Sequence, residues 1–116
     1  MFVPNITLLG EPLGVCLAAA AFLVGGIVNA TGLPAIRASF VDLGFPGWWC
    51  RVTAVLEIGA AVLLLMPAGR LVGIALGGCI MVAAMAAILA RRLYGHLPPP
   101  VLFLVLLALA GLGHAA

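Results

Sequence analysis

One carboxyl group, Glu57, lies in the middle of an apolar segment that runs over residues 48–66. On a helix that rises about 1.5 Å per residue, Glu57 lies about 14 Å beyond Trp48, close to the midplane of a bilayer. An acid at that depth costs about 3 kcal/mol or more to insert, so it should face other helices and have a polar partner, or stay protonated. This position predicts a carboxyl group that binds a proton or a ligand.

Two further polar residues are expected close to Glu57. Thr53 precedes it by four residues and therefore shares its helix face. Asn29 lies near the end of the preceding apolar segment, at a predicted depth similar to that of Thr53. We therefore predict a line of polar side chains that leads inward from one membrane face. The alternative interpretation is a structural hydrogen bond that ties helices together, and the sequence leaves both open.

The cysteines and histidines give weaker signals. Cys16, Cys50 and Cys79 form no Cys-x-x-Cys pair and are expected at different depths, so we interpret them as packing residues without an intrachain disulfide. His96 and His114 belong to segments on opposite sides of the predicted membrane and have no second ligand of suitable type nearby. We interpret them as solvated residues at the interface, and we expect no metal site.

The composition indicates a membrane protein. Apolar residues make up 66% of the 116 residues and charged residues only 7%, against about 25% in an ordinary soluble domain. A soluble fold of this size could not bury so much apolar surface. The net charge of +2 is too small and too scattered to indicate a nucleic-acid partner.

Four apolar stretches must carry the polar residues across the bilayer. They are long enough, or nearly so, to span the hydrocarbon core, and their Ala and Leu content without strand-like alternation favours helices. We predict an all-α polytopic membrane protein, a single domain over residues 1–116 built as a bundle of four transmembrane helices. The predicted spans are residues 13–33, 48–66, 71–90 and 98–114.

The connection between the first two spans is expected to form a short helix in the membrane interface. Over residues 34–45 the apolar side chains gather near one helical face, which is typical of an interfacial helix. An irregular connector is the alternative.

The arginines predict the orientation of the bundle in a cell (inner or plasma) membrane. All but one of them fall in the two longer loops, which places these loops in the cytoplasm and both chain termini outside it. The same side chains could attract anionic lipid head groups. The arginines on the predicted cytoplasmic side are Arg37, Arg51, Arg91 and Arg92, and Arg70 lies on the other side.

Three glycines recur every four residues along the third span. Gly69, Gly73 and Gly77 form overlapping small-x-x-x-small steps, which allow helix backbones to approach closely in a membrane. We expect this face either to pack inside the bundle or to contact a second copy or another membrane protein.

Three segments together resemble the DoxX-like family of small four-helix membrane proteins. They are a glycine-containing run at residues 26–29, the turn Phe-Val-Asp-Leu-Gly-Phe-Pro at residues 40–46, and the run around the acid at residues 54–59. The resemblance implies a four-helix membrane fold with a membrane-embedded Glu. The chain departs from the family pattern at Asn29, where many members have Lys, so a Lys–Glu pair is not expected.

The resemblance leaves three classes of function open. Family members are linked to quinone-coupled oxidation, to redox-associated membrane complexes and to the assembly of other membrane proteins. The first class is therefore an accessory or scaffolding component of a larger, redox-linked membrane complex. The second is a quinone-associated oxidoreductase component that uses Glu57 for proton transfer, with the quinone as its only implied cofactor. The third is a small proton-coupled transporter. The sequence holds no cofactor or nucleophile motif, so we lean away from an enzyme.

Overall fold

The computed structural model describes residues 4–115, with side chains for residues 13–112. Within this range the chain forms helices joined by short turns, and no strand is present. The order is α1 (Pro4–Ala30), α2 (Pro34–Asp42), α3 (Trp49–Leu65), η1 (Pro67–Gly69), α4 (Arg70–Ala90), η2 (Tyr94–His96) and α5 (Pro98–Ala115). The prediction of an all-α protein is confirmed.

Prolines and glycines set the ends of these helices. Pro34 and Pro98 begin α2 and α5, where the missing amide proton costs nothing because the first turn of a helix leaves its N–H groups unpaired. Gly32, after α1, and Gly44, after α2, have φ of +62° and +94°. Residues with a Cβ rarely adopt such angles, so glycine is required where the chain leaves each helix.

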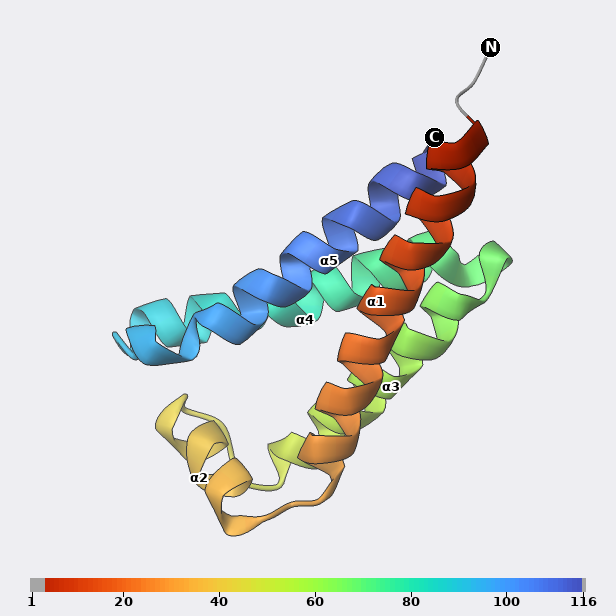
Figure 1. Ribbon diagram of the computed structural model, residues 1–116. Helices are drawn as coiled ribbons and strands as arrows, with labels where there is room; N and C mark the ends of the chain where they lie inside the picture. Colours follow the sequence, from red (N-terminus) through yellow and green to blue (C-terminus); the bar gives the residue numbers. More distant parts are fainter. Residues whose placement is uncertain (1–3, 116) are drawn as a thin grey trace.

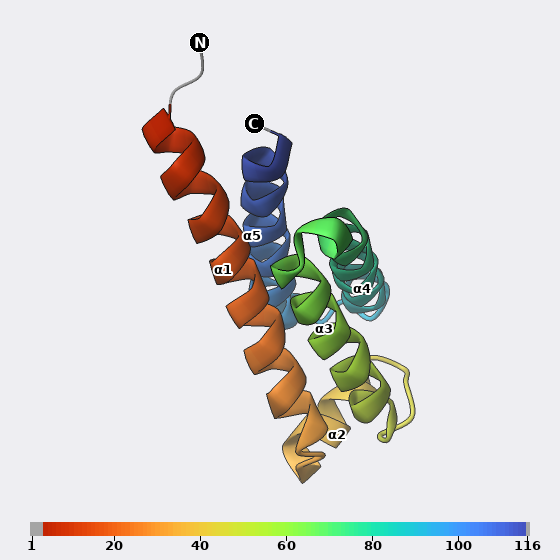
Figure 2. The same cartoon turned by 90° about the vertical axis from the view of Figure 1, so that its right-hand side faces the viewer.

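The long helices pack as neighbours around a ring. α1 lies against α3 and α5, and α4 lies against the same two helices from the other side. The beginning of α1 and the end of α5 lie at one end of the molecule, and α2 lies at the opposite end (Figures 1 and 2). Toward α2, the α4–α5 pair diverges from the α1–α3 pair (Figure 1).

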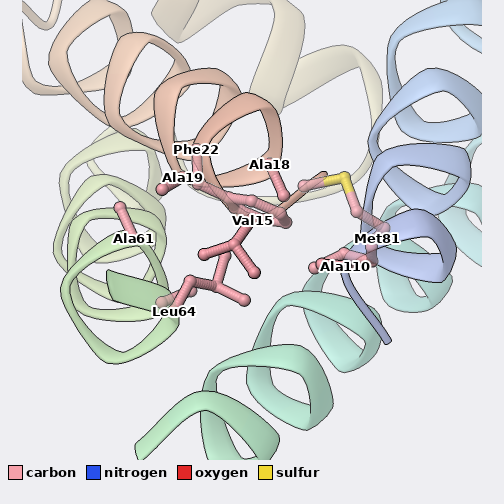
Figure 3. Packing of buried hydrophobic residues seen from close by; sticks show 10 residues of the cluster. Val15, Ala18, Ala19, Phe22, Ala61, Leu64, Met81 and Ala110 are labelled. Carbon is pink, nitrogen blue, oxygen red and sulfur yellow. The ribbon is translucent and has the colours of Figure 1, made fainter. Parts of the chain in front are cut away.

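The buried core lies at the end away from α2. Small side chains dominate it, so the backbones of α1, α3, α4 and α5 approach closely around Phe22 and Leu64, which are fully buried. Figure 3 shows side chains of the four long helices meeting in this cluster. The core residues are Val15, Ala18, Ala19, Phe22, Ala60, Ala61, Leu64, Met81, Leu107 and Ala110.

Three stretches of the described chain are long and apolar enough to cross a membrane: Leu13–Ala30, Pro67–Ala90 and Tyr94–Leu112. α3 is shorter, at 17 residues, and carries both Arg51 and Glu57. Three helices are therefore candidate membrane spans, and the four crossings stay a prediction. The first predicted span, residues 13–33, extends beyond the C-terminal end of the helix, because α1 ends at Ala30 and the chain turns at Gly32.

The short helix expected between the first two spans is α2, which has 9 residues and buries none of them. It follows α1 after a brief turn and lies across the end of the bundle (Figure 1). Its position in the membrane interface stays a prediction.

Candidate functional site

Glu57 occupies the middle of α3 and is only 3% exposed. Its partner is Asn29, near the end of α1, whose Nδ2 donates a hydrogen bond to Glu57 Oε1 at 2.5 Å. The structure therefore brings two of the predicted site residues into direct contact. Among the side chains that the structure describes, those of residues 13–112, none forms an ion pair with Glu57.

Gly25 provides the space that the other carboxylate oxygen occupies. It lies one turn before Asn29 on α1, and a Cβ at this position would come within 2.8 Å of Glu57 Oε2. The adjacent Gly26 receives Ile58, since a Cβ there would lie 2.6 Å from Cγ1 of that side chain. α1 therefore contacts α3 closely at both glycines, and the carboxyl group lies against its backbone.

A cavity of about 680 Å³ opens beside Glu57. It lies between the diverging helix pairs and extends to α2, and all five α-helices contribute to its walls. The lining is mostly apolar. The lining residues are Gly25, Val28, Asn29, Phe40, Leu43, Phe45, Trp49, Thr53, Leu56, Glu57, Leu76, Cys79, Ile80, Met81, Ala83, Ala84, Pro99, Pro100 and Phe103.

Four aromatic rings belong to the cavity wall. Phe45 stacks on Trp49 with ring centroids 6.0 Å apart and an interplanar angle of 8°, and Phe40 meets Phe45 edge to face at 6.4 Å. From α5, Phe103 lines the cavity and packs edge to face on the buried ring of Phe22 at 5.0 Å. Such contacts hold the rings in fixed orientations.

The second oxygen of Glu57 lies beside Gly25 and is not fully enclosed. No side-chain nitrogen or oxygen in the described residues is both fully enclosed and without a hydrogen-bond partner. The hydrogen bond from Asn29 goes to Oε1. Oε2 forms none with the side chains described, so it is not fully enclosed and the cavity that Glu57 lines is the space available to it. A ligand in the cavity can therefore reach this oxygen.

The arginines of the two longer loops lie away from Glu57, around the α2 end. Arg51 lies over Gly32, where a Cβ would come within 2.8 Å of its guanidinium, and Arg91 lies over Gly44. Arg37 packs beside Gly47 in the same region, and Arg37, Arg51, Arg91 and Arg92 are all exposed. The structure thus gathers arginines from the two longer loops at one end. Their contact with lipid head groups stays a prediction.

A comparison with protein families identifies the class of this membrane protein. The model of the DoxX-like family matches residues 14–110, which is most of the chain. The chain belongs to the DoxX-like family. The resemblance predicted from the turn and the embedded acid is thereby confirmed, and the cavity lies wholly within the matched part of this DoxX-like protein. No curated protein and no solved structure matches the chain.

Thr53, the cysteines and the histidines of this DoxX-like protein take no part in the hydrogen bond between Asn29 and Glu57. Thr53 is half-buried and lines the cavity. All three cysteines are free, but Cys50 alone is buried; the packing interpretation is wrong for Cys16 and Cys79, which are exposed. Within the described residues no group of three or more His, Cys, Asp or Glu could hold a metal ion. His96 is exposed, and the side chain of His114 lies outside the described residues.

The glycine face of α4 packs inside the chain's own bundle. A Cβ at Gly73 would lie 2.8 Å from the backbone nitrogen of Leu64, and one at Gly77 would lie 2.8 Å from the ring of Phe22. Gly69 belongs to η1 and lies against Leu63. Intramolecular neighbours therefore already cover this face.

Sequence reasoning indicated that Gly25 and Gly26 could receive a neighbouring helix, but it missed the cavity and the contact between Gly25 and Glu57. One signal was present, because Gly25 and Asn29 are four residues apart and share a face of α1. The aromatic wall gave no such signal, since its rings come from α2, the following turn, α3 and α5.

Proposed function

We propose that this DoxX-like protein is an integral membrane protein of four crossings that binds a membrane-dissolved small molecule in the cavity beside Glu57. α3 supplies the fourth crossing, because 17 residues fall at the lower end of the about 17–25 that a transmembrane helix needs. α2 lies in the cytoplasmic interface, and both termini lie outside the cytoplasm, as the arginines on the α2 side favour.

The observation that carries this proposal is a buried carboxyl group that opens onto an apolar cavity. Glu57 is 3% exposed, and the cavity of about 680 Å³ is within the roughly 300–1,000 Å³ of small-molecule sites. An ionisable side chain within a membrane helix is costly to keep and usually serves a ligand or a proton. A helix-tying hydrogen bond alone would need no adjoining cavity.

Polar and apolar residues of the site contact different parts of a ligand. Glu57 Oε2, the amide of Asn29 and the hydroxyl of Thr53 can form hydrogen bonds with the polar group of a ligand. The aromatic rings and the face of α4 contact its apolar body. Because the walls are apolar, hydrogen bonds within the cavity are stronger than in water, and they fix how the ligand is oriented.

A quinone is the ligand that the family resemblance favours, and the lining fits one. The N–H of Asn29 and the hydroxyl of Thr53 could donate to a ring carbonyl, and a protonated Glu57 could do the same. Rings such as Trp49 and Phe103 could pack on the planar head. A bound quinone would supply redox chemistry, and Glu57 would hold a proton at Oε2.

The arrangement of the described helices supports an accessory role in a larger, redox-linked membrane complex. Four of the five α-helices serve the bundle, so little of the described chain remains for any activity outside the bilayer. We expect a partner membrane protein to co-purify after extraction in mild detergent. Recovery of the native protein solely as a free, stable monomer would contradict this role.

Tryptophan fluorescence can test whether the cavity binds a ligand. Trp49 lines the cavity, whereas Trp48 is 55% exposed and does not. In the Trp48→Phe variant, a short-chain quinone should quench the emission of Trp49 to a saturable limit. The matched Trp49→Phe variant should show only the gradual quenching that follows partition of the quinone into the micelle. The same unsaturable quenching in both variants would contradict a binding site.

A variant that fills the cavity provides the control. Ala84 lies on the lining face of α4. Ala84→Phe in the Trp48→Phe background should abolish the saturable component while the helical content stays unchanged by circular dichroism. Saturable quenching that persists in this variant would place the bound quinone elsewhere.

A further inference from the structure

We propose that the preferred ligand of this cavity is a lipophilic organic cation, in which an ammonium or phosphonium centre is attached to an apolar body and Glu57 is the counter-ion. This inference rests on the proposed function, because it names the chemical class that the same cavity selects. A neutral quinone is then a weaker ligand that occupies the space without matching its charge.

The lining of the cavity carries a negatively charged group and no positively charged one. Among its residues are one acid, Glu57, and no Arg, Lys or His. The arginines near this end are exposed, and those whose contacts the structure gives lie against Gly32, Gly44 and Gly47 instead of Glu57. In an apolar surrounding, water and salt screen a charge poorly, so this acid acts strongly on a ligand in the cavity.

The aromatic rings of the cavity wall also favour a positively charged ligand. The face of an aromatic ring carries partial negative charge and attracts cations at distances up to about 6 Å from the ring centre. Four rings line the cavity, those of Phe40, Phe45, Trp49 and Phe103. A cation thus finds a carboxylate and aromatic rings in one site, whereas an anion is repelled by the carboxylate.

The hydrogen bonding of Glu57 leaves its charge incompletely balanced. Asn29 contributes a neutral N–H to Oε1, and Gly25 allows Oε2 to lie at the cavity edge without a protein donor. A carboxylate in an apolar site needs a counter-charge or a proton. A bound cation supplies that counter-charge, so cation binding and ionisation of Glu57 favour each other.

The size and ligand count of the cavity exclude an inorganic cation. A metal ion needs several oxygen or nitrogen ligands at short distance, and within the described residues no group of three acidic, His or Cys side chains is present. A cavity of about 680 Å³ instead matches a drug-sized organic molecule. The cation must therefore carry its own apolar body.

Two probes of similar shape and opposite charge test this inference. Tetraphenylphosphonium is cationic and tetraphenylborate is anionic, and a short-chain quinone is the neutral reference. Each is titrated into the purified full-length protein in a non-ionic detergent, with Trp49 fluorescence in the Trp48→Phe background as the readout and protein-free micelles as the blank. The tested variants are Glu57→Gln, which removes the charge, and Glu57→Asp, which retains it. Thermal unfolding checks that each variant is folded.

We expect tetraphenylphosphonium to bind at least about tenfold more tightly than tetraphenylborate, and about tenfold more weakly to Glu57→Gln than to the unsubstituted site. Glu57→Asp should retain the preference for the cation. The quinone should change about threefold or less in Glu57→Gln. Gly78→Ala, on α4 but outside the cavity lining, should leave the preference between the two ions unchanged.

Two results would overturn the inference. The first leaves the proposed function of the cavity intact, and the second contradicts that function as well. Saturable quinone binding, with tetraphenylphosphonium either not binding or insensitive to Glu57→Gln, would refute the cation and leave the proposed cavity function intact. Failure of all three probes to bind saturably would remove the proposed function and the inference together.

Discussion

The two ends of the bundle differ in how their helices approach one another. At the end that holds the beginning of α1, four helices meet around alanines and glycines, and Gly73 lets α4 lie against the backbone of α3. At the α2 end, α1 and α3 stay in contact at Gly26, but α4 and α5 diverge and a cavity takes the place of a core (Figure 1). The fold is thus held together at one end and hollow at the other.

This difference separates residues that stabilise the fold from residues that serve the site. In lipid, helices associate through close packing and not through a hydrophobic drive, so the small residues of the closed end carry most of the stability. The open end carries Glu57 and the aromatic rings. Substitutions at the closed end should lower stability, and substitutions at the open end should alter binding.

The largest effect is expected at Gly73. Its Cβ would lie 2.8 Å from the backbone nitrogen of Leu64, which cannot move aside, so Gly73→Ala should lower the free energy of unfolding by about 2 kcal/mol through overpacking. Unfolding in mixed micelles with a denaturing detergent measures it. Gly78 is the matched control on the same helix, because nothing lies within 4 Å of its added Cβ. Equal destabilisation at both positions would contradict the closed packing at Gly73.

A smaller effect on stability and a clear effect on binding are expected at Gly25. An added methyl group meets Glu57 Oε2, the far end of a flexible side chain, so Gly25→Ala should cost about 1 kcal/mol of stability and displace the carboxyl group into the cavity. Titration with tetraphenylphosphonium should show about tenfold weaker binding.

A second substitution checks the cause of the Gly25 effect. Glu57→Asp shortens the acid by one methylene and makes room for the methyl group of Ala. The double variant should therefore be more stable than the sum of the single effects by about 1 kcal/mol. Strict additivity would show that Gly25 and Glu57 do not share this contact.

A more modest effect is expected when the hydrogen bond to Glu57 is removed. Asn29→Leu takes away the N–H that Glu57 Oε1 accepts, and such a bond within a membrane protein contributes about 0.6 kcal/mol on average. The same mixed-micelle unfolding measures the loss. In the Glu57→Leu background, Asn29→Leu should have little effect on the free energy of unfolding. A full effect in that background would contradict the hydrogen bond between the two residues.

The smallest effect is expected at Thr53. It lines the cavity and is half-buried, but it forms no hydrogen bond with Glu57 in the side chains that the structure describes. Thr53→Val keeps its shape, so stability should change by less than about 0.5 kcal/mol. A tenfold loss of quinone binding, measured by Trp49 quenching, would show that its hydroxyl is a principal anchor of the ligand.

Much of the fold could be predicted from the sequence because few physical rules determine it. Apolar stretches of bilayer length must be helical, and prolines and glycines mark where they end, as at Pro98 and Gly44. The contact between Asn29 and Glu57 could be anticipated because a buried acid requires a polar partner and few polar residues exist at that depth. The confirmed family membership followed from the turn at residues 40–46 and its spacing to the acid.

The cavity could not be predicted because it depends on how helices diverge. Helical periodicity shows which side chains share a face, but it gives no angle between one helix pair and another. Cys79 illustrates this: its sequence neighbourhood suggests a packed thiol, yet the side chain is exposed and lines the cavity. The partner of Gly25 was hidden for the same reason.

Infrared difference spectroscopy of the carboxyl group tests most directly whether Glu57 is the polar anchor of a ligand cavity. Spectra of the protein in lipid nanodiscs are recorded before and after addition of tetraphenylphosphonium, and then repeated with Glu57→Gln. We predict that the cation removes a protonated-carboxyl band and adds a carboxylate band, and that both changes are absent in Glu57→Gln. An unchanged carboxyl spectrum at saturating cation, or the same changes in Glu57→Gln, would contradict a ligand site at Glu57.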